Sequence, residues 1–132
     1  MRTIQFTLSG LLLCLIGLWT PQIQAQDAVK ADPEHYTVEF ENDQVRVLRI
    51  KYGPGEKSVM HQHPNAVAVM LTETNGMMTL PDGSMIEDRN KAGTAIFTPE
   101  ATHLPQNNGS EPMELILVEL KTCDHKMHKS KN

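Results

Sequence analysis

The chain has 132 residues, with 12 Lys and Arg against 16 Asp and Glu, and its formal net charge is −4. This acidic balance argues against a nucleic-acid partner, because proteins bind polyphosphate mainly through basic side chains. A chain of this length can build one hydrophobic core but has no room for a second domain.

The first segment, residues 1–25, has the layout of a secretory signal peptide. Arg2 precedes an apolar run at 11–19, and Pro21 and the small residue Ala25 follow that run. The run is shorter than the roughly 20 residues that a helix needs to span a bilayer. We therefore expect the segment to be removed after Ala25, leaving a secreted or periplasmic protein with no stable membrane anchor.

Two alternatives to this cleavage stay open. Ile23 is larger than the residue usually found at its position in a cleavage signal, so a cut after Ala28 is one alternative, and an uncleaved anchor is the other. Removal of the signal would take Cys14 with it and leave Cys123 alone. The mature chain would then have no intrachain disulfide, and its stability would come from its core.

The rest of the chain divides into a polar leader (26–35), a folded domain (36–121) and a polar tail (122–132). No segment of the domain keeps the apolar pattern of a helix over three turns. Short apolar runs recur instead, divided by Gly, Pro, Asn and Asp, as is typical of strands. The runs are YTVEF, VRVLRIKY, AVAVML, MMTL, MI, AIF and MELILVEL. This spacing predicts an all-β fold, a small antiparallel sandwich or barrel of about six to eight strands.

Two local features refine this prediction. In the run at 45–52 the apolar residues change phase between Val47 and Leu48, which indicates either a β-bulge or a strand buried on both faces. The stretch PDGS at 81–84 contains Asp-Gly, a strong signal for a β-hairpin turn.

The stretch MHQHPNAVAV at 60–69 contains two histidines two positions apart. Side chains at i and i+2 of a strand project to the same face, so His61 and His63 point together and can bind one cation through neutral imidazoles. A pair of this kind is also common as two solvent-facing side chains, so the pair alone leaves both interpretations open.

A second motif lies further along the chain. Residues 55–63 have the form G-x5-H-x-H, and residues 93–107 have the form G-x5-P, followed by His103 and then, after three more residues, by Asn107. Together they resemble the paired motifs of the cupin superfamily, and the resemblance covers nearly all of residues 38–120. More narrowly, the chain is similar to small single-domain cupins of the beta-alanine-degradation type and to uncharacterised cupin_2-like proteins.

The resemblance implies a compact double-sheet β-barrel (jelly roll) in which His61, His63 and His103 bind one divalent metal ion. The carboxylate that the family usually has in the first motif is missing, because its two candidate positions hold Val67 and Ala68. Imidazole ligands suit iron, zinc, manganese, nickel and copper, and the sequence does not distinguish among these metals.

The missing carboxylate determines the chemistry that we expect. Val67 has the strand parity of the two histidines, so we expect Val67 and Val69 to form an apolar wall of the pocket. A divalent ion among three neutral imidazoles lacks a counter-charge, and a small anionic substrate would provide one. We therefore expect oxygenase- or isomerase-type chemistry on such a molecule. Met77 and Met85, beside the hairpin, and Asn107, after the third histidine, complete the expected pocket.

Other interpretations stay open beside this one. A metal-free cup that binds or senses a small ligand would also explain the missing carboxylate, and incidental histidines are a third interpretation. A homodimer formed through sheet edges is expected by analogy only. In the tail, Cys123, His125 and His128 form C-x-H-x-x-H, which is either a ligand group for a soft metal or part of a polar terminus.

Overall fold

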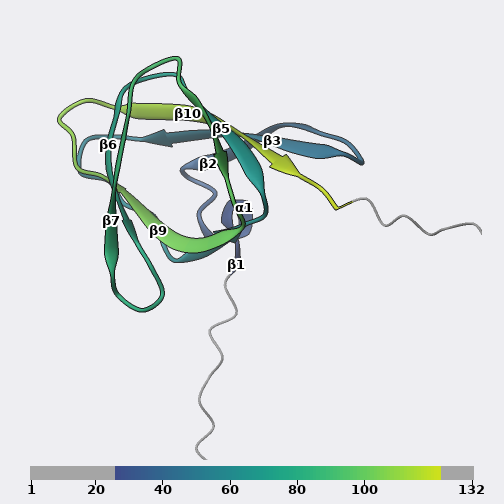
Figure 1. The fold of residues 1–132 in the computed structure, drawn as a ribbon, viewed down its shortest axis with the longest axis horizontal. Coiled ribbons are helices and arrows are strands. Elements are labelled where there is room, and N and C mark those ends of the chain that lie inside the picture. Colours follow the sequence, from purple (N-terminus) through teal and green to yellow (C-terminus); the bar gives the residue numbers. More distant parts are fainter. Residues whose placement is uncertain (1–25, 123–132) are drawn as a thin grey trace, which may run out of the picture.

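The computed structural model describes residues 26–122, which form ten β-strands and one short α-helix (Figure 1). The elements are β1 (Gln26–Asp27), α1 (Ala28–Ala31), β2 (Tyr36–Glu41), β3 (Val45–Tyr52), β4 (His61–His63), β5 (Ala66–Met70), β6 (Thr74–Thr79), β7 (Met85–Asn90), β8 (Ala95–Thr98), β9 (Ala101–Asn107) and β10 (Met113–Leu120). Among the described residues no helix has the length and apolarity needed to cross a bilayer. The expected signal peptide and the Cys123, His125 and His128 group lie outside the described residues, so both stay predictions.

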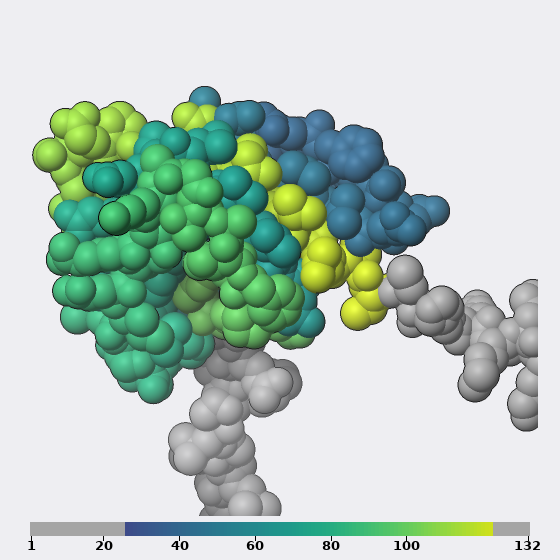
Figure 2. All heavy atoms as spheres, turned by 45° about the horizontal axis from the view of Figure 1, so that its top comes forward, coloured from purple at the N-terminus to yellow at the C-terminus, as the bar shows by residue number. Residues whose placement is uncertain are grey.

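The strands form two five-stranded sheets, with the orders β1-β4-β9-β6-β7 and β2-β3-β10-β5-β8. Neighbouring strands are antiparallel, except that β1 runs parallel to β4. The prediction of an all-β, antiparallel, double-sheet barrel is therefore confirmed. The β2–β3 hairpin extends beyond the body of the domain, where it is the blue projection in the space-filling view (Figure 2).

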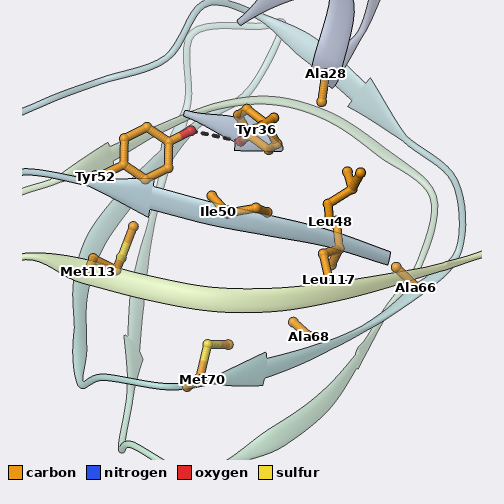
Figure 3. Packing of buried hydrophobic residues seen from close by; sticks show 10 residues of the cluster. All are labelled: Ala28, Tyr36, Leu48, Ile50, Tyr52, Ala66, Ala68, Met70, Met113 and Leu117. Atoms are coloured by element: carbon orange, nitrogen blue, oxygen red, sulfur yellow. Dashed lines mark hydrogen bonds between the residues drawn. The ribbon is translucent and has the colours of Figure 1, made fainter. Parts of the chain in front are cut away.

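Alternation along the strands separates the core from the surface. On β5, Ala66, Ala68 and Met70 are buried and the two valines between them are only partly buried. Strand side chains point to alternate faces, so every second residue contributes to the interior. Figure 3 shows this core between the strands. Its buried apolar members are Ala28, Tyr36, Leu48, Ile50, Tyr52, Ala66, Ala68, Met70, Met113 and Leu117.

Residues 26–35, expected to form a polar leader, are part of the domain. β1 pairs with β4 so that Gln26 lies opposite His61, and Asp27 lies opposite Gln62. Ala28 is fully buried in the core. The pattern of apolar residues missed this segment because a two-residue strand and a four-residue helix are too short to show a period.

The two local predictions had different outcomes. β3 pairs with β10 without interruption from Val45 to Tyr52, and the register shift lies in β2 instead, between Val38 and Phe40. The PDGS turn is confirmed, because β6 and β7 pair as an antiparallel hairpin around it. Gly83 adopts φ of 84°, a conformation that favours glycine.

We predict that Leu48→Ala destabilises the fold far more than Leu71→Ala does. Leu48 is 0% exposed, and emptying a buried leucine site usually costs about 2 to 5 kcal/mol. Leu71 is 43% exposed, so the same chemical change there should cost about 1 kcal/mol or less. Equilibrium urea unfolding of the two variants measures both costs, and equal losses would contradict this description of the core.

Candidate metal centre

Two adjacent strands bring the three histidines together. His61 and His63 lie on β4 on either side of Gln62, and His103 lies on β9 directly opposite His61. Each ring offers one nitrogen, and these three atoms all lie within 4.8 Å of one another. Both β4 histidines are buried, with 0% and 5% exposure, and His103 is half-buried. The three side chains could therefore hold a single ion.

Hydrogen bonds on the far side of each β4 ring determine which nitrogen faces the centre. His61 Nδ1 donates to the carbonyl oxygen of Val59 at 2.8 Å, and His63 Nδ1 donates to Glu119 Oε1 at 2.6 Å. Both acceptors lack a proton to give, so each Nδ1 must carry the hydrogen and each Nε2 has a free lone pair. The two Nε2 atoms lie 3.1 Å apart. Two lone pairs at this distance repel each other unless a cation lies between them.

Burial keeps the rings in the form that binds metal. Burial, followed by the nearby His63, lowers the pKa of His61 to about 4. Burial also lowers the pKa of His103 to about 3, with the two other histidines adding to the effect. At neutral pH both rings are therefore uncharged, as imidazole ligands must be.

A tyrosine pair lies at the edge of the centre. The Tyr36 hydroxyl is 3.0 Å from His61 Nε2. It also lies 2.7 Å from the Tyr52 hydroxyl, a contact drawn as a dashed line in Figure 3. Burial, with Tyr52 as the next cause, raises the pKa of Tyr36 well above its usual value. The hydroxyl is therefore protonated at neutral pH and provides a hydrogen-bond donor beside the histidines.

Glu119 is a buried residue in contact with the candidate centre that the motif comparison missed. Its side chain is 2% exposed, and its second oxygen accepts a hydrogen bond from Arg46 Nε at 2.5 Å. Burial raises the pKa of Glu119, but the hydrogen bonds from His63 and Arg46 outweigh burial and hold the pKa below its usual value. A signal for Glu119 was present, since it has the inward parity of Leu117 in an otherwise apolar strand.

A second carboxylate lies behind His61. Ser58 Oγ donates to Asp32 Oδ2 at 2.5 Å and lies 3.3 Å from His61 Nδ1. Asp32 is 8% exposed and also accepts a hydrogen bond from His35. The expectation that the centre lacks negative charge therefore needs correction, because carboxylates lie behind both β4 histidines although none touches the three ring nitrogens.

A cavity of about 390 Å³ opens beside the histidines. His63, His103 and Tyr36 line it together with apolar side chains from both sheets, among them Ala68 and Met70. Its volume lies at the lower end of the range for small-molecule sites, about 300 to 1,000 Å³. The cavity is thus an apolar chamber with imidazole and phenol groups on one part of its wall.

Val67 and Val69 do not line this cavity, which corrects the expected pocket. The prediction assumed that the alternation of side chains along the strand continues unchanged from His63 to Val67 and Val69. The chain instead leaves the first sheet after His63 and enters the second at Ala66. Pro64 and Asn65 lie between the two strands and interrupt the alternation of side chains. Alanine and methionine positions of β5 therefore face the interior, and the valines face away from it.

The two hairpin methionines also need correction. Met78 and Ile86 line the cavity, whereas Met77 does not and Met85 is 67% exposed. Each prediction chose the wrong one of two adjacent residues, since neighbouring side chains in a strand point to opposite faces. Asp88, two residues beyond Ile86, is a further lining residue, and burial raises its pKa.

Asn107 stabilises a loop and does not line the cavity. Its side chain is almost fully buried, and its Nδ2 donates to the carbonyl oxygens of Gly53 at 3.1 Å and Glu111 at 2.8 Å. Its Oδ1 accepts from the Gly109 amide at 2.9 Å. These bonds join two loops at the end of β9, so Asn107 has a structural role here.

Acid should destabilise the metal-free fold. The pKa values of His61 (about 4) and His103 (about 3) lie below the value of about 6.5 for an unfolded chain, so the unfolded state binds more protons as the pH falls. This penalty is absent above about pH 6.5 and grows as the pH falls toward about 3.

Replacing one of these histidines isolates its share of the pH dependence. His103→Gln should show a shallower loss of unfolding free energy between about pH 6.5 and 3 than the unchanged chain. Urea midpoints measured in the presence of chelator across that window provide the comparison. Parallel pH profiles for the two proteins would refute the assignment of a low pKa to His103.

Comparison with known proteins gives structural matches only. No protein-family model and no curated protein matches the sequence. A cupin domain from Bordetella pertussis Tohama I matches with a TM-score of 0.62 and 22% identity, over 76% of this chain and 99% of that chain. An uncharacterised conserved protein with a double-stranded β-helix domain from Klebsiella pneumoniae matches with a TM-score of 0.53 and 23% identity, over 64% and 74% of the two chains.

A third match is to a protein named for its activity. The polyketide cyclase RemF from Streptomyces resistomycificus matches with a TM-score of 0.51 and 16% identity, over 66% of this chain and 64% of that chain. These matches agree on the arrangement of the two sheets, which is the arrangement that the paired histidine motifs imply. The chain has the double-stranded β-helix fold of cupin domains.

Proposed function

We propose that this chain binds one divalent metal ion through His61, His63 and His103 and catalyses an oxygenase- or isomerase-type reaction on a small anionic molecule. One observation carries the metal-binding part of the proposal: the Nε2 atoms of His61 and His63, which carry free lone pairs, lie 3.1 Å apart. Hydrogen bonds behind both rings fix this arrangement. A buried contact between two acceptors is costly, and a bound cation removes the cost.

A metal ion satisfies this arrangement better than a proton does. A proton could join only the two β4 nitrogens, whereas a metal ion also engages His103, whose nitrogen lies within the same 4.8 Å. The pKa of His61, about 4, further disfavours a proton on that ring at neutral pH. Three imidazoles suit iron, zinc, manganese, nickel or copper, so the identity of the metal is left to measurement.

The bound ion would supply a Lewis acid with open positions for an anionic group of the substrate, and redox chemistry if it is iron or copper. The protein's own residues orient and enclose that substrate. The Tyr36 hydroxyl, protonated and 3.0 Å from His61 Nε2, can donate a hydrogen bond to the same anionic group. Apolar residues make up most of the remaining cavity wall and would limit the contact of a bound substrate with water.

The cavity narrows the substrate class. Away from the histidines and tyrosines its lining is apolar except for Asp88 and Thr98, so a substrate with an apolar body and one carboxylate, enolate or thiolate group directed at the histidines fits it best. Because the match to the polyketide cyclase shows the fold alone, it identifies no substrate, but it provides a precedent for an enzyme built on this fold.

Metal content tests the proposal directly. The purified chain should contain close to one metal ion per molecule by plasma mass spectrometry, and a His61→Ala, His103→Ala double variant should contain almost none. Gln62→Ala is the matched control, because Gln62 lies between the two β4 histidines but is outside the three-histidine group. It should keep the metal.

The same preparation separates catalysis from binding. Turnover of small apolar anions should disappear with chelator and return when the metal is restored. Saturable binding without turnover would show that the chain is a binding or sensing protein and would contradict the proposed catalysis. A chain that takes up none of the five metals would overturn the metal centre itself.

A bulky side chain at Ala68 should block the cavity. Ala68→Phe, with Ala68→Leu as a milder variant, should weaken binding of 2-naphthoate, an apolar carboxylate, by about tenfold or more while the metal content stays unchanged. Val67→Phe is the control on the same strand, because Val67 does not line the cavity. Fluorescence titration measures the binding. Equal weakening by the Val67 variant would place the substrate elsewhere.

A further inference from the structure

Three charged side chains extend from the back of His63 to the first described strand. Glu119 Oε1 lies 2.6 Å from His63 Nδ1, and Glu119 Oε2 accepts from Arg46 Nε at 2.5 Å. Arg46 also donates through Nη2 to the carboxylate of Asp27 on β1. The sequence positions 27, 46, 63 and 119 are far apart, so only the fold brings this chain of contacts together.

Strand pairing determines the position of each member. Glu119 lies directly opposite Arg46 in the pairing of β10 with β3, so both side chains project from the same face. The parallel pairing of β1 with β4 places Asp27 opposite Gln62, the residue that precedes His63 in the chain. The first residues of the domain therefore reach the back of the candidate metal centre.

The burial of these groups increases inward. The side chains of Asp27, Arg46 and Glu119 are 30%, 18% and 2% exposed, respectively. A buried carboxylate is costly unless donors surround it, and Glu119 has two donors, His63 and Arg46. An acid next to a histidine ligand fixes the ring's tautomer and orientation and makes its free nitrogen a better ligand.

We propose that Glu119 is a positioning residue of the metal centre, and that β1 is a functional part of that centre because Asp27 holds Arg46 against Glu119. The inference rests on the proposed function. Glu119 supplies, from behind His63, the negative charge that is absent at Val67 and Ala68. It does so without occupying a coordination position, which leaves room for an anionic substrate.

A second cluster of the same composition provides a matched control. Arg49, on β3, contacts Glu39 on β2 and Glu114 on β10, so the two clusters share β3 and β10. These side chains are 31%, 37% and 28% exposed, and within the described residues no histidine is among their hydrogen-bond or ion-pair partners. If Glu119 only stabilised the fold, substitutions at Glu114 and Glu119 would differ only in how much they lower stability. If Glu119 positions His63, only the substitution at Glu119 should change metal binding.

The test compares Glu119→Gln and Asp27→Asn with the control Glu114→Gln in the full chain. Glutamine at 119 keeps the size and an acceptor for His63 Nδ1 but removes the charge. Glu119→Gln should weaken Co²⁺ and Zn²⁺ binding by about 10- to 100-fold, the usual effect of losing such a partner, and should alter the Co²⁺ absorption spectrum. Asp27→Asn should weaken binding in the same direction but less, and the control should leave it unchanged.

Competition with a chromophoric chelator measures the affinities, and thermal unfolding of the metal-free proteins confirms that each variant is folded. Glu119→Asp should retain more affinity than Glu119→Gln, since it keeps the charge. Unchanged affinity in folded Glu119→Gln or Asp27→Asn, with normal binding by the unaltered chain, would overturn this inference alone. Failure of the unaltered chain to bind either metal would overturn the proposed function and this inference with it.

Discussion

The hydrogen bonds from His61 Nδ1 to the Val59 carbonyl and from His63 Nδ1 to Glu119 determine which nitrogen of each ring faces its neighbour. Because both rings carry their proton on Nδ1, the free lone pairs are on the two Nε2 atoms, which lie at a distance of 3.1 Å from each other. The third histidine completes the group from β9 because strand pairing places it opposite His61. The rest of the interior is arranged around this constraint, with an apolar cavity on one side and charged groups on the other.

The charged side of the centre is costly for a small domain. Glu119 and Asp32 are almost fully buried, and replacing such groups with apolar residues commonly stabilises a protein. Arg46 and Ser58 offset part of that cost by donating hydrogen bonds. A cavity of about 390 Å³ in the same interior adds to the cost, because its walls lose packing contacts. These features together lower the stability of the fold, and the binding site proposed above would account for them.

Much of this arrangement could be predicted from the sequence. Strand spacing indicated an all-β domain, and period-two geometry placed His61 and His63 on one face, as the structure does. The paired motifs added His103 by resemblance, and the structure brings the three rings together. The same geometry would also have pointed Glu119 inward, since it shares the parity of Leu117, but a motif comparison does not search that strand.

The sequence by itself determined the residues that lie near each other along one strand, because their relative orientation depends only on the two-residue period. Only the tertiary structure decided which sheet each strand joins. The chain changes sheets at Pro64, so the parity of His63 did not extend to Val67, and Ala68 faces the cavity instead. It also decided that Asp27 reaches the back of the centre, because a contact across sheets depends on strand order and register and leaves no periodic signal in the sequence.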